Sequence, residues 1–309
     1  MTDKKILIAA PRGWCAGVDR AVEIVQRALD RYGPPVYVRK QIVHNSHVVT
    51  TLEEAGAIFV ESEEDVPPGS ICVLSAHGVA PTVYANAKAR NITVIDATCP
   101  LVTKVHVEAR RFAKQGRTIF LIGHNGHEEV EGTSGQAPDQ TIVLERPEDV
   151  AGLKVADPDN VAFISQTTLA VDDTREVVEA LRRQFPHIAG PTKDDICYAS
   201  QNRQQAVKEI AQRADLVLVV GSQNSSNSNR LVEVARDEGA KAFLIEDERS
   251  IDPNWIESAA IIGISSGAST PEVLVDRVVK HLADRGIVQV EEVSVAIEDV
   301  HFPLPASVT

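Results

Sequence analysis

Short apolar runs alternate with amphipathic helical segments along most of the chain. The run KILIAA at residues 5–10 is followed by AVEIVQRALDRYG at 21–33 and then by PVYVRKQIV at 35–43. Strands that alternate with helices in this way are typical of α/β proteins with parallel sheets. The pattern therefore predicts an α/β fold built mainly from parallel strands.

A cysteine and two further polar residues follow successive strand-like runs, and this order occurs three times. The three sets are Cys15, His44 and His77; Cys99, His127 and Thr167 with its neighbour Thr168; and Cys197, Ser225 and Ser269. From each cysteine, the second residue is 29, 28 and 28 positions on, and the third is 62, 68 and 72 positions on. This spacing predicts an internal repeat of roughly 90 to 100 residues, each repeat being a small α/β unit.

The repeat predicts three lobes and a tail. The lobes are expected at residues 14–98, 99–193 and 194–285, with strand 1–13 joined to the third, and the tail at 286–309 carries no readable motif. Ligands in parallel α/β units bind beyond the carboxyl ends of the strands, where all of these polar residues are predicted to lie. Three lobes facing one another about a pseudo-threefold axis would bring them to one central cavity.

Three converging cysteines suggest a metal centre. Thiolates select zinc, copper(I) or iron–sulfur clusters, and structural zinc usually takes four ligands from paired motifs, whereas no two cysteines here are close in sequence. Three thiolates suit a cluster with one open iron, while zinc and plain structural cysteines remain the alternatives from spacing alone. The fourth cysteine, Cys72, lies inside the apolar run SICVLSA and is expected to pack in the core.

The motif IGHNGHEEVEGT at residues 122–133 carries candidate acid–base groups. No histidine lies four residues after His127, so a zincin helix is excluded. The nearby carboxylates are Glu129 and Glu131, and a glutamate held beside hydrophobic walls can have a raised pKa and deliver a proton. Glu128 is expected to lie in a solvated acidic turn.

The motif GSQNSSNSNRL at residues 221–231 follows an apolar run and precedes an amphipathic segment. Hydroxyls, amides and backbone N–H groups at a helix N-terminus form an anion site, although a simple helix cap is the alternative. Together with His44, His77, His127 and Ser269, the motif predicts a diphosphate cradle without lysine. No P-loop or dinucleotide-binding fingerprint is present to hold a nucleotide.

Composition narrows the functional classes. The 309 residues include 31 Lys and Arg against 44 Asp and Glu, a formal charge of −13, which argues against a broad nucleic-acid-binding surface. The N-terminal apolar run is too short for a signal peptide, and no run approaches the roughly 18 residues of a membrane span. We therefore expect a cytoplasmic protein without nucleic-acid or membrane partners, in which widely spaced cysteines do not form a disulfide framework.

Several long motifs closely resemble the 4-hydroxy-3-methylbut-2-enyl diphosphate reductase family. They are PRGWCAGVDRA, IVHN, SAHGV, DATCPLVTKVH, GHNGHEEVEGT, SQTTLAVDDT, KDDICYAS, GSQNSSNSNRL and GASTP, in order from Ile6 to about Leu282. The resemblance implies a three-lobed α/β fold around one 4Fe–4S cluster, with three cysteine ligands and one open iron that takes the substrate hydroxyl. It also implies an oxidoreductase that removes the allylic hydroxyl with two electrons and two protons. The products would be isopentenyl and dimethylallyl diphosphates, the last step of the methylerythritol phosphate isoprenoid pathway. A ferredoxin or flavodoxin would supply the electrons.

The resemblance also implies roles for individual residues. Cys15, Cys99 and Cys197 match the cluster ligands, Glu129 the proton source, and Thr167 the threonine near the substrate hydroxyl. His127 matches the histidine beside the diphosphate and the proton relay. The remaining diphosphate binders would be His44, His77, Ser225, Ser226, Asn227 and Ser269. The sequence departs from the family pattern at Glu128, where many relatives have proline. Glutamate in place of proline is expected to loosen the turn before Glu129, but it removes no functional group.

Two rival functions use the same cysteines. A redox-neutral 4Fe–4S dehydratase would turn over without a reductant, and a non-catalytic cluster or metal sensor would convert nothing. An assay with and without reductant separates all three.

Overall fold

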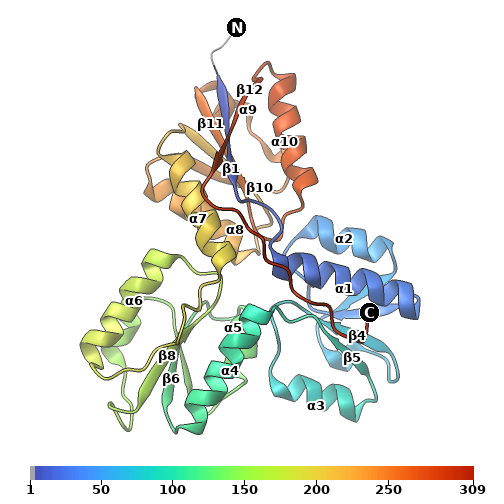
Figure 1. The fold of residues 1–309 in the computed structure, drawn as a ribbon, viewed down its shortest axis with the longest axis vertical. Helices are drawn as coiled ribbons and strands as arrows, with labels where there is room; N and C mark the ends of the chain where they lie inside the picture. Colours follow the sequence, from blue (N-terminus) through green and yellow to red (C-terminus); the bar gives the residue numbers. More distant parts are fainter. Residues whose placement is uncertain (1–3) are drawn as a thin grey trace. The chain divides into compact units, whose positions relative to one another are not determined.

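The computed structural model describes residues 4–309, which form an α/β fold (Figure 1). Its residues group into two compact units. The first unit holds the N-terminal segment through Val18, His44–Val48 and Tyr198–His301, and the second holds Asp19–Val43, Val49–Cys197 and Phe302–Thr309. Two helices, α1 (Ala16–Tyr32) and α2 (Ser46–Glu54), begin in the first unit and end in the second.

The first unit contains a five-stranded parallel sheet with the order β10-β9-β11-β1-β12. Its strands are β1 (Lys5–Ala10), β9 (Leu216–Val220), β10 (Lys241–Ile245), β11 (Ile261–Ser266) and β12 (Gln289–Ser294). Its helices are α7 (Tyr198–Ala211), α8 (Ser226–Asp237), α9 (Pro253–Glu257), α10 (Glu272–Asp284) and the short η3 (Glu248–Ser250).

Both faces of this sheet are apolar, as expected for parallel strands covered by helices. Successive residues of β1 point to opposite faces, so that Ile6 packs in the layer with α10 while Leu7 packs in the layer with α7 and α8. Val278 of α10 and Ile210 of α7 are fully buried in these two layers. The two layers hold the ends of the strands in fixed positions.

The second unit contains two further parallel sheets, ordered β3-β2-β4-β5 and β7-β6-β8. Their strands are β2 (Val36–Arg39), β3 (Ala57–Val60), β4 (Ile71–Leu74), β5 (Thr93–Asp96), β6 (Thr118–Ile122), β7 (Thr141–Leu144) and β8 (Val161–Ser165). The helices are α3 (Pro81–Ala89), α4 (Pro100–Lys114), α5 (Glu128–Ser134) and α6 (Val171–Gln184), with the short η1 (Glu63–Asp65) and η2 (Pro147–Gly152).

The predicted repeat is visible in the order of strands within each sheet. In each, the first strand of the repeat (β2, β6 or β9) lies between the second (β3, β7 or β10) and the third (β4, β8 or β11). Each repeat begins with a helix, α1, α4 or α7, that starts directly after Cys15, Cys99 or Cys197. The prediction of an α/β fold with repeated, mainly parallel sheets is confirmed.

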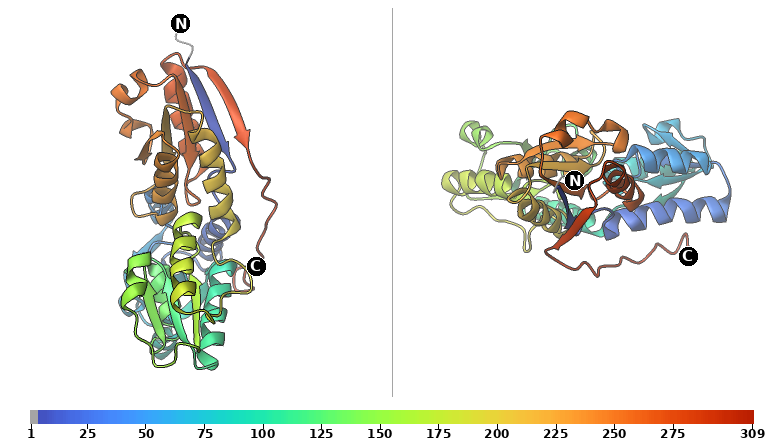
Figure 2. Two further views of the ribbon diagram at one scale, coloured as in Figure 1. Left: turned by 90° about the vertical axis from the view of Figure 1, so that its left-hand side faces the viewer. Right: turned by 90° about the horizontal axis from the view of Figure 1, so that it is seen from above.

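One local prediction is wrong, and one segment without a readable motif proves to be a strand. The segment DDI before Cys197 is not a strand, because the Asp195 carboxylate folds back to accept the N–H of Ser165 at 2.9 Å and binds Lys104 Nζ at 2.7 Å. The tail contains the strand β12, which pairs with β1 along its whole length and lies beside it in Figure 2. The alternation of β12 was unreadable because Glu291 and Glu292 interrupt its apolar residues.

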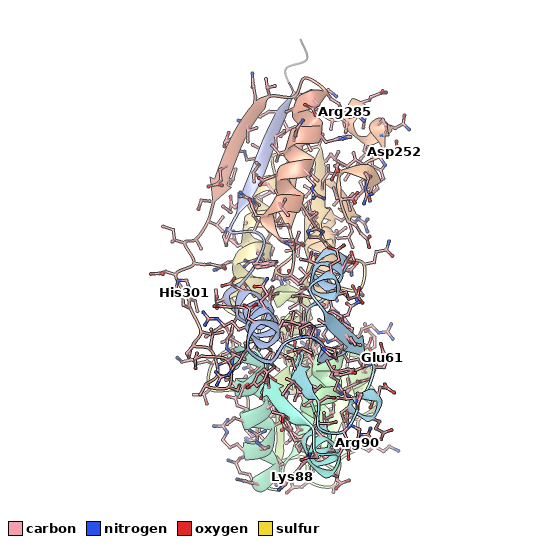
Figure 3. The ribbon with its side chains drawn as sticks, turned by 90° about the vertical axis from the view of Figure 1, so that its right-hand side faces the viewer. Glu61, Lys88, Arg90, Asp252, Arg285 and His301 are labelled. Atoms are coloured by element: carbon pink, nitrogen blue, oxygen red, sulfur yellow. The ribbon has the colours of Figure 1, made fainter. Side chains whose placement is uncertain are left out.

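The end of the tail packs along α1 within the second unit. Arg20 Nε donates to the Pro303 carbonyl at 2.8 Å, and the Tyr32 hydroxyl donates to that of Ser307 at 2.9 Å. Val308 is buried. Charged side chains such as Glu61 and Lys88 lie on the surface of this unit (Figure 3). Within residues 4–309, no helix has both the length and the apolar character needed to cross a bilayer.

Candidate functional site

Three predicted site residues of the second unit follow the carboxyl ends of β4, β6 and β8. His77 follows β4, His127 follows β6 and caps the N-terminus of α5, and Thr167 follows β8. Within each of the two sheets the strands are parallel, so each of these residues lies at the carboxyl edge of its own sheet. The arrangement brings His77, His127, Glu129 and Thr167 into one connected cluster.

Glu129 and Thr167 form the buried centre of this cluster. Glu129 is 2% exposed, and its two carboxylate oxygens accept the backbone N–H of Thr167 at 2.6 Å and the Thr167 hydroxyl at 3.0 Å. Burial raises the pKa of Glu129 to about 7, while the two hydrogen bonds from Thr167 oppose the shift. A carboxyl group with this pKa is present in both protonation states near neutral pH, as a general acid must be.

His127 is held in one tautomer by the backbone beside Glu129. Its Nδ1 accepts the N–H of Glu129 at 3.1 Å, so the proton of a neutral ring lies on Nε2. Burial, together with the charge of His77, lowers the pKa of His127 to about 4. The ring is therefore neutral at pH 7 and offers a hydrogen-bond donor at Nε2.

Glu128 is not in a solvated turn, contrary to the prediction. Its Oε2 lies 3.0 Å from His77 Nδ1, and both side chains are largely buried. Burial raises the pKa of Glu128, but the hydrogen bond and charge of His77 outweigh that effect and hold it below its usual value. Because a carboxylate only accepts, Nδ1 of His77 carries the proton. The His77 ring also packs edge-on against that of His127, with centroids 5.8 Å apart.

Two of the predicted metal ligands belong to the second unit and are tied to this cluster through the backbone. The N–H of Cys197 donates to the Thr167 carbonyl at 3.0 Å, and the N–H of Cys99 donates to the Ala76 carbonyl at 3.0 Å, next to His77. Arg20 Nη1 donates to the Thr98 carbonyl at 3.1 Å, which further fixes the segment before Cys99. Both cysteines are half-buried thiols.

The first unit carries the other predicted residues, joined by the loop after β11. The N–H of Cys15 donates to the Ala268 carbonyl at 3.2 Å, and the N–H of Ala268 donates to Asn227 Oδ1 at 2.8 Å. The Ser269 hydroxyl donates to the His44 carbonyl at 2.8 Å. Cys15, His44, Asn227 and Ser269 are thus connected within this unit.

The serine- and asparagine-rich motif forms the start of α8. Ser225 is the N-cap, and its hydroxyl oxygen accepts the N–H of Ser228 at 3.3 Å. Ser226 is the first residue of the helix, and the Asn224 amide lies 3.4 Å from His44 Nδ1. The helix cap and the polar cluster therefore coexist at this position.

Cys72 occupies the environment predicted for it. The side chain is 1% exposed in the apolar cluster with Leu74 and Val83. Burial raises the pKa of its thiol to about 11. The Cys72 side chain therefore packs in the core, as predicted.

Sequence reasoning missed Asp195 and the partner of His77. Asp195 is buried, two residues before Cys197, and binds Lys104. The sequence signal that could have identified Asp195 is its place in KDDIC, where a carboxylate is followed by an apolar residue and a cysteine. The pairing of Glu128 with His77 joins residues 51 positions apart and left no local signal.

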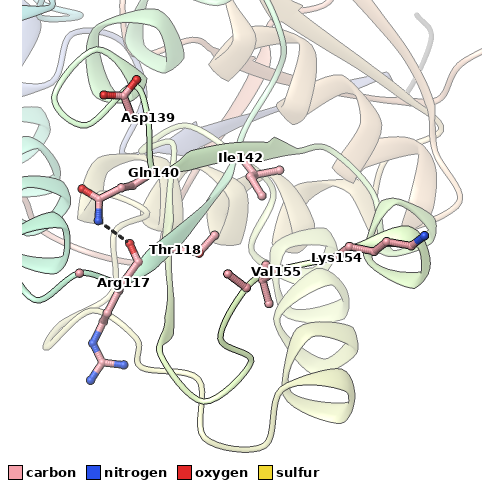
Figure 4. A pocket seen from close by; sticks show the side chains of 9 residues that line it. Arg117, Thr118, Asp139, Gln140, Ile142, Lys154 and Val155 are labelled. Atoms are coloured by element: carbon pink, nitrogen blue, oxygen red, sulfur yellow. Dashed lines mark hydrogen bonds between the residues drawn. The ribbon is translucent and has the colours of Figure 1, made fainter.

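A surface pocket of about 220 Å³ lies elsewhere in the second unit, at the amino ends of β6 and β7 (Figure 4). Thr118 and Ile142 line it, and Gln140 Nε2 donates to the Arg117 carbonyl at 3.0 Å beside it. It is at the opposite ends of the strands from the cluster around Glu129, so it plays no part in that site.

Comparisons with known proteins agree on one family. The sequence profile of the family described as LytB protein matches residues 6–283. The chain is 59% identical over 303 residues to the 4-hydroxy-3-methylbut-2-enyl diphosphate reductase of Acidothermus cellulolyticus. The matched region covers 98% of this chain and 89% of that protein. The chain is 58% identical over 308 residues to that of Mycolicibacterium paratuberculosis, with 99% and 93% covered.

Solved structures lead to the same family. The E-1-hydroxy-2-methyl-but-2-enyl-4-diphosphate reductase of Plasmodium falciparum superposes with a TM-score of 0.96 at 39% identity, covering 99% of this chain and 96% of that one. A structure described as (E)-4-hydroxy-3-methyl-but-2-enyl diphosphate reductase, the terminal enzyme of the non-mevalonate pathway, gives a TM-score of 0.64 at 30% identity, covering 91% and 99%. With strand-end residues, repeated sheets and near full-length similarity all in agreement, the chain belongs to the LytB protein family.

Proposed function

We propose that this chain reduces (E)-4-hydroxy-3-methylbut-2-enyl diphosphate to isopentenyl and dimethylallyl diphosphates, the last step of the methylerythritol phosphate pathway. The observation that carries the proposal is the buried Glu129–Thr167 pair, in a chain 59% identical to a reductase of that name. The reaction consumes two electrons and two protons, and the allylic hydroxyl leaves as water. It therefore needs an electron-transfer group and an acid.

Cys15, Cys99 and Cys197 are assigned as ligands of one 4Fe–4S cluster with one iron free of protein ligands. All three thiols are half-buried, and each directly precedes a helix, whose N-terminus favours negative charge. The donor set suits iron and sulfide, whereas the core thiol of Cys72 does not. When bound, the cluster would supply the electrons and a Lewis-acidic iron for the leaving oxygen.

Glu129 is assigned as the acid that protonates the leaving oxygen. Thr167 holds both carboxylate oxygens, so the group keeps one orientation, and burial keeps part of it protonated at neutral pH. The neutral ring of His127 donates from Nε2 to a ligand or to the proton relay. Thr167 also links this acid to Cys197 through its carbonyl.

The diphosphate is assigned to histidines, hydroxyls and an amide. The set comprises His44, His77, His127, Ser225, Ser226, Asn227 and Ser269. These side chains are hydrogen-bond donors suited to phosphate oxygens, and α8 adds its N-terminus. We also propose a cytoplasmic location. A ferredoxin or flavodoxin would supply the two electrons that the reaction consumes.

The test is turnover of the anaerobically purified protein with and without a strong reductant. Formation of both product diphosphates only with reductant is the expected result. Loss of water without reductant would instead identify a redox-neutral dehydratase. A protein that binds iron and sulfide but converts nothing under either condition would be a sensor.

Replacing His44 or His77 with asparagine is expected to weaken substrate binding. Each histidine would lose a charge-assisted hydrogen bond to the diphosphate, about 1.5 to 3 kcal/mol, or roughly tenfold to a hundredfold in affinity. The measurement is the substrate Kd of variants that retain their iron. Unchanged affinity in both variants would remove these histidines from the diphosphate site.

Replacing Glu128 with glutamine is expected to raise KM about tenfold with little change in kcat. The carboxylate accepts the Nδ1 proton of His77 and so fixes the orientation of the ring. When the ring also carries a proton on Nε2, that nitrogen can donate to a phosphate oxygen. The matched control is Glu131→Gln, three residues on and exposed. Equal KM values in the two variants would show that Glu128 does not position His77.

A further inference from the structure

The loop between β1 and α1 carries Cys15 and is fixed at its other positions by the first unit. The N–H of Gly13 donates to the Ser266 hydroxyl oxygen at 2.9 Å. Gly13 has φ +64°, and a Cβ added at this position would lie 3.2 Å from the Thr270 carbonyl oxygen. The position therefore requires glycine. These contacts hold the amide groups of the loop, and its carbonyl groups need donors of their own.

Arg203 of α7 supplies those donors. Its side chain is 0% exposed, and its Nε and Nη2 donate to the Gly13 carbonyl at 3.0 and 2.7 Å. Nη2 also donates to the carbonyl of Trp14, the residue before Cys15, at 3.3 Å. Nη1 donates to the Ala199 carbonyl at 3.0 Å, which fixes the guanidinium on its own helix. The buried guanidinium of Arg203 therefore holds the backbone directly before Cys15 in place.

The counter-ion of Arg203 comes from the tail. Arg203 Nη1 lies 3.0 and 3.2 Å from the two carboxylate oxygens of Glu298, whose side chain is 14% exposed. The Asn202 amide donates to the same carboxylate at 3.1 Å. Glu298 reaches this position because β12 pairs with β1 and Val295 N–H then donates to the Ala10 carbonyl at 2.9 Å. It lies beyond residues 6–283, the span that the family profile matches.

We infer that Arg203 and Glu298 are positioning residues for Cys15, and that the tail beyond β12 thereby helps to hold the cluster. This inference rests on the proposed function, in which Cys15 is a cluster ligand. A buried guanidinium is tolerated only when it is paired. Removing Glu298 leaves Arg203 without its carboxylate, so the guanidinium shifts toward solvent and releases the carbonyls of Gly13 and Trp14.

The experiment measures iron release from anaerobically purified full-length protein to an excess of chelator, at a temperature where every variant remains folded by circular dichroism. The variants are Glu298→Ala and Glu298→Gln, with Glu298→Asp as the conservative replacement. The control is Glu292→Gln, because Glu292 pairs with Arg12 of the same loop at 3.0 Å but is 60% exposed. An exposed ion pair contributes little to the stability of the structure around it.

Glu298→Ala is expected to release iron roughly 10- to 100-fold faster than the wild type, as replacing residues that support metal ligands typically does. Glu298→Asp should restore slow release in part, and the Glu292 control should match the wild type. The electron paramagnetic resonance spectrum of the reduced cluster should also change in Glu298→Ala. If Glu298→Ala does not fold, Glu298→Gln decides by the same measurement.

Wild-type release rates and an unchanged spectrum in the folded Glu298 variants would overturn the inference and leave the proposed function standing. A merely structural role would lower thermal stability without accelerating iron release from the folded protein, and would overturn it equally. Wild-type protein that contains no iron would overturn the proposed function, and this inference with it.

Discussion

Glu129→Gln is expected to lower kcat by roughly 10²- to 10⁴-fold, the usual contribution of a general acid. The amide keeps the shape of the carboxyl group and can remain against Thr167, but it cannot release a proton. Because burial raises the pKa of Glu129 to about 7, wild-type kcat should fall as the pH rises above 7 and the acid deprotonates. That alkaline limb should be absent from the residual activity of the variant.

The measurement is steady-state turnover from pH 6 to 9 on protein whose iron content and substrate affinity match the wild type. Glu131→Gln is the control, since its carboxylate is exposed one residue beyond Val130 on the same helix. Near wild-type turnover of the Glu129 variant, or a larger loss in the Glu131 variant, would assign the acid elsewhere.

Serine in place of Cys15, Cys99 or Cys197 is expected to abolish turnover and to remove most of the cluster absorbance. A hydroxyl is a poor substitute for a thiolate on iron. The comparison is Cys72→Ser, which changes the same atom in the apolar cluster around Leu74. That variant should lose some stability, because it buries a hydroxyl, but should keep both iron and activity.

Iron and sulfide content, absorbance and turnover are measured together on all four anaerobically purified variants. Full iron content and activity in any of the first three would remove that cysteine from the ligand set. Loss of the cluster in folded Cys72→Ser would add a ligand that the proposal does not contain.

The repeated fold was readable from the sequence because each strand and its following polar residue form a local pattern. The runs before His77, His127 and Ser225 are short, apolar and bounded by polar residues, and β4, β6 and β9 are all observed there. The same reasoning failed for DDI, whose conformation is set by Asp195 binding Lys104, 91 positions away. It also failed for β12, whose place depends on pairing with β1 at the other end of the chain.

The candidate site was predictable in its residue types and less so in its contacts. Glu129 and Thr167 were each identifiable at strand ends, but the two hydrogen bonds between them span 38 positions. Burial of Glu129, which raises its pKa, exists only in the folded chain. The Glu128–His77 pair and the Arg203–Glu298 pair are likewise formed only by the folded chain.

The most direct test of the central claim, a cluster held by three cysteines, is the Mössbauer spectrum of anaerobic protein loaded with ⁵⁷Fe, recorded before and after substrate is added. Three cysteine ligands leave one iron chemically distinct from the other three. We expect a three-to-one division of the signal, with substrate changing only the smaller component. Four equivalent irons that do not respond to substrate would contradict it.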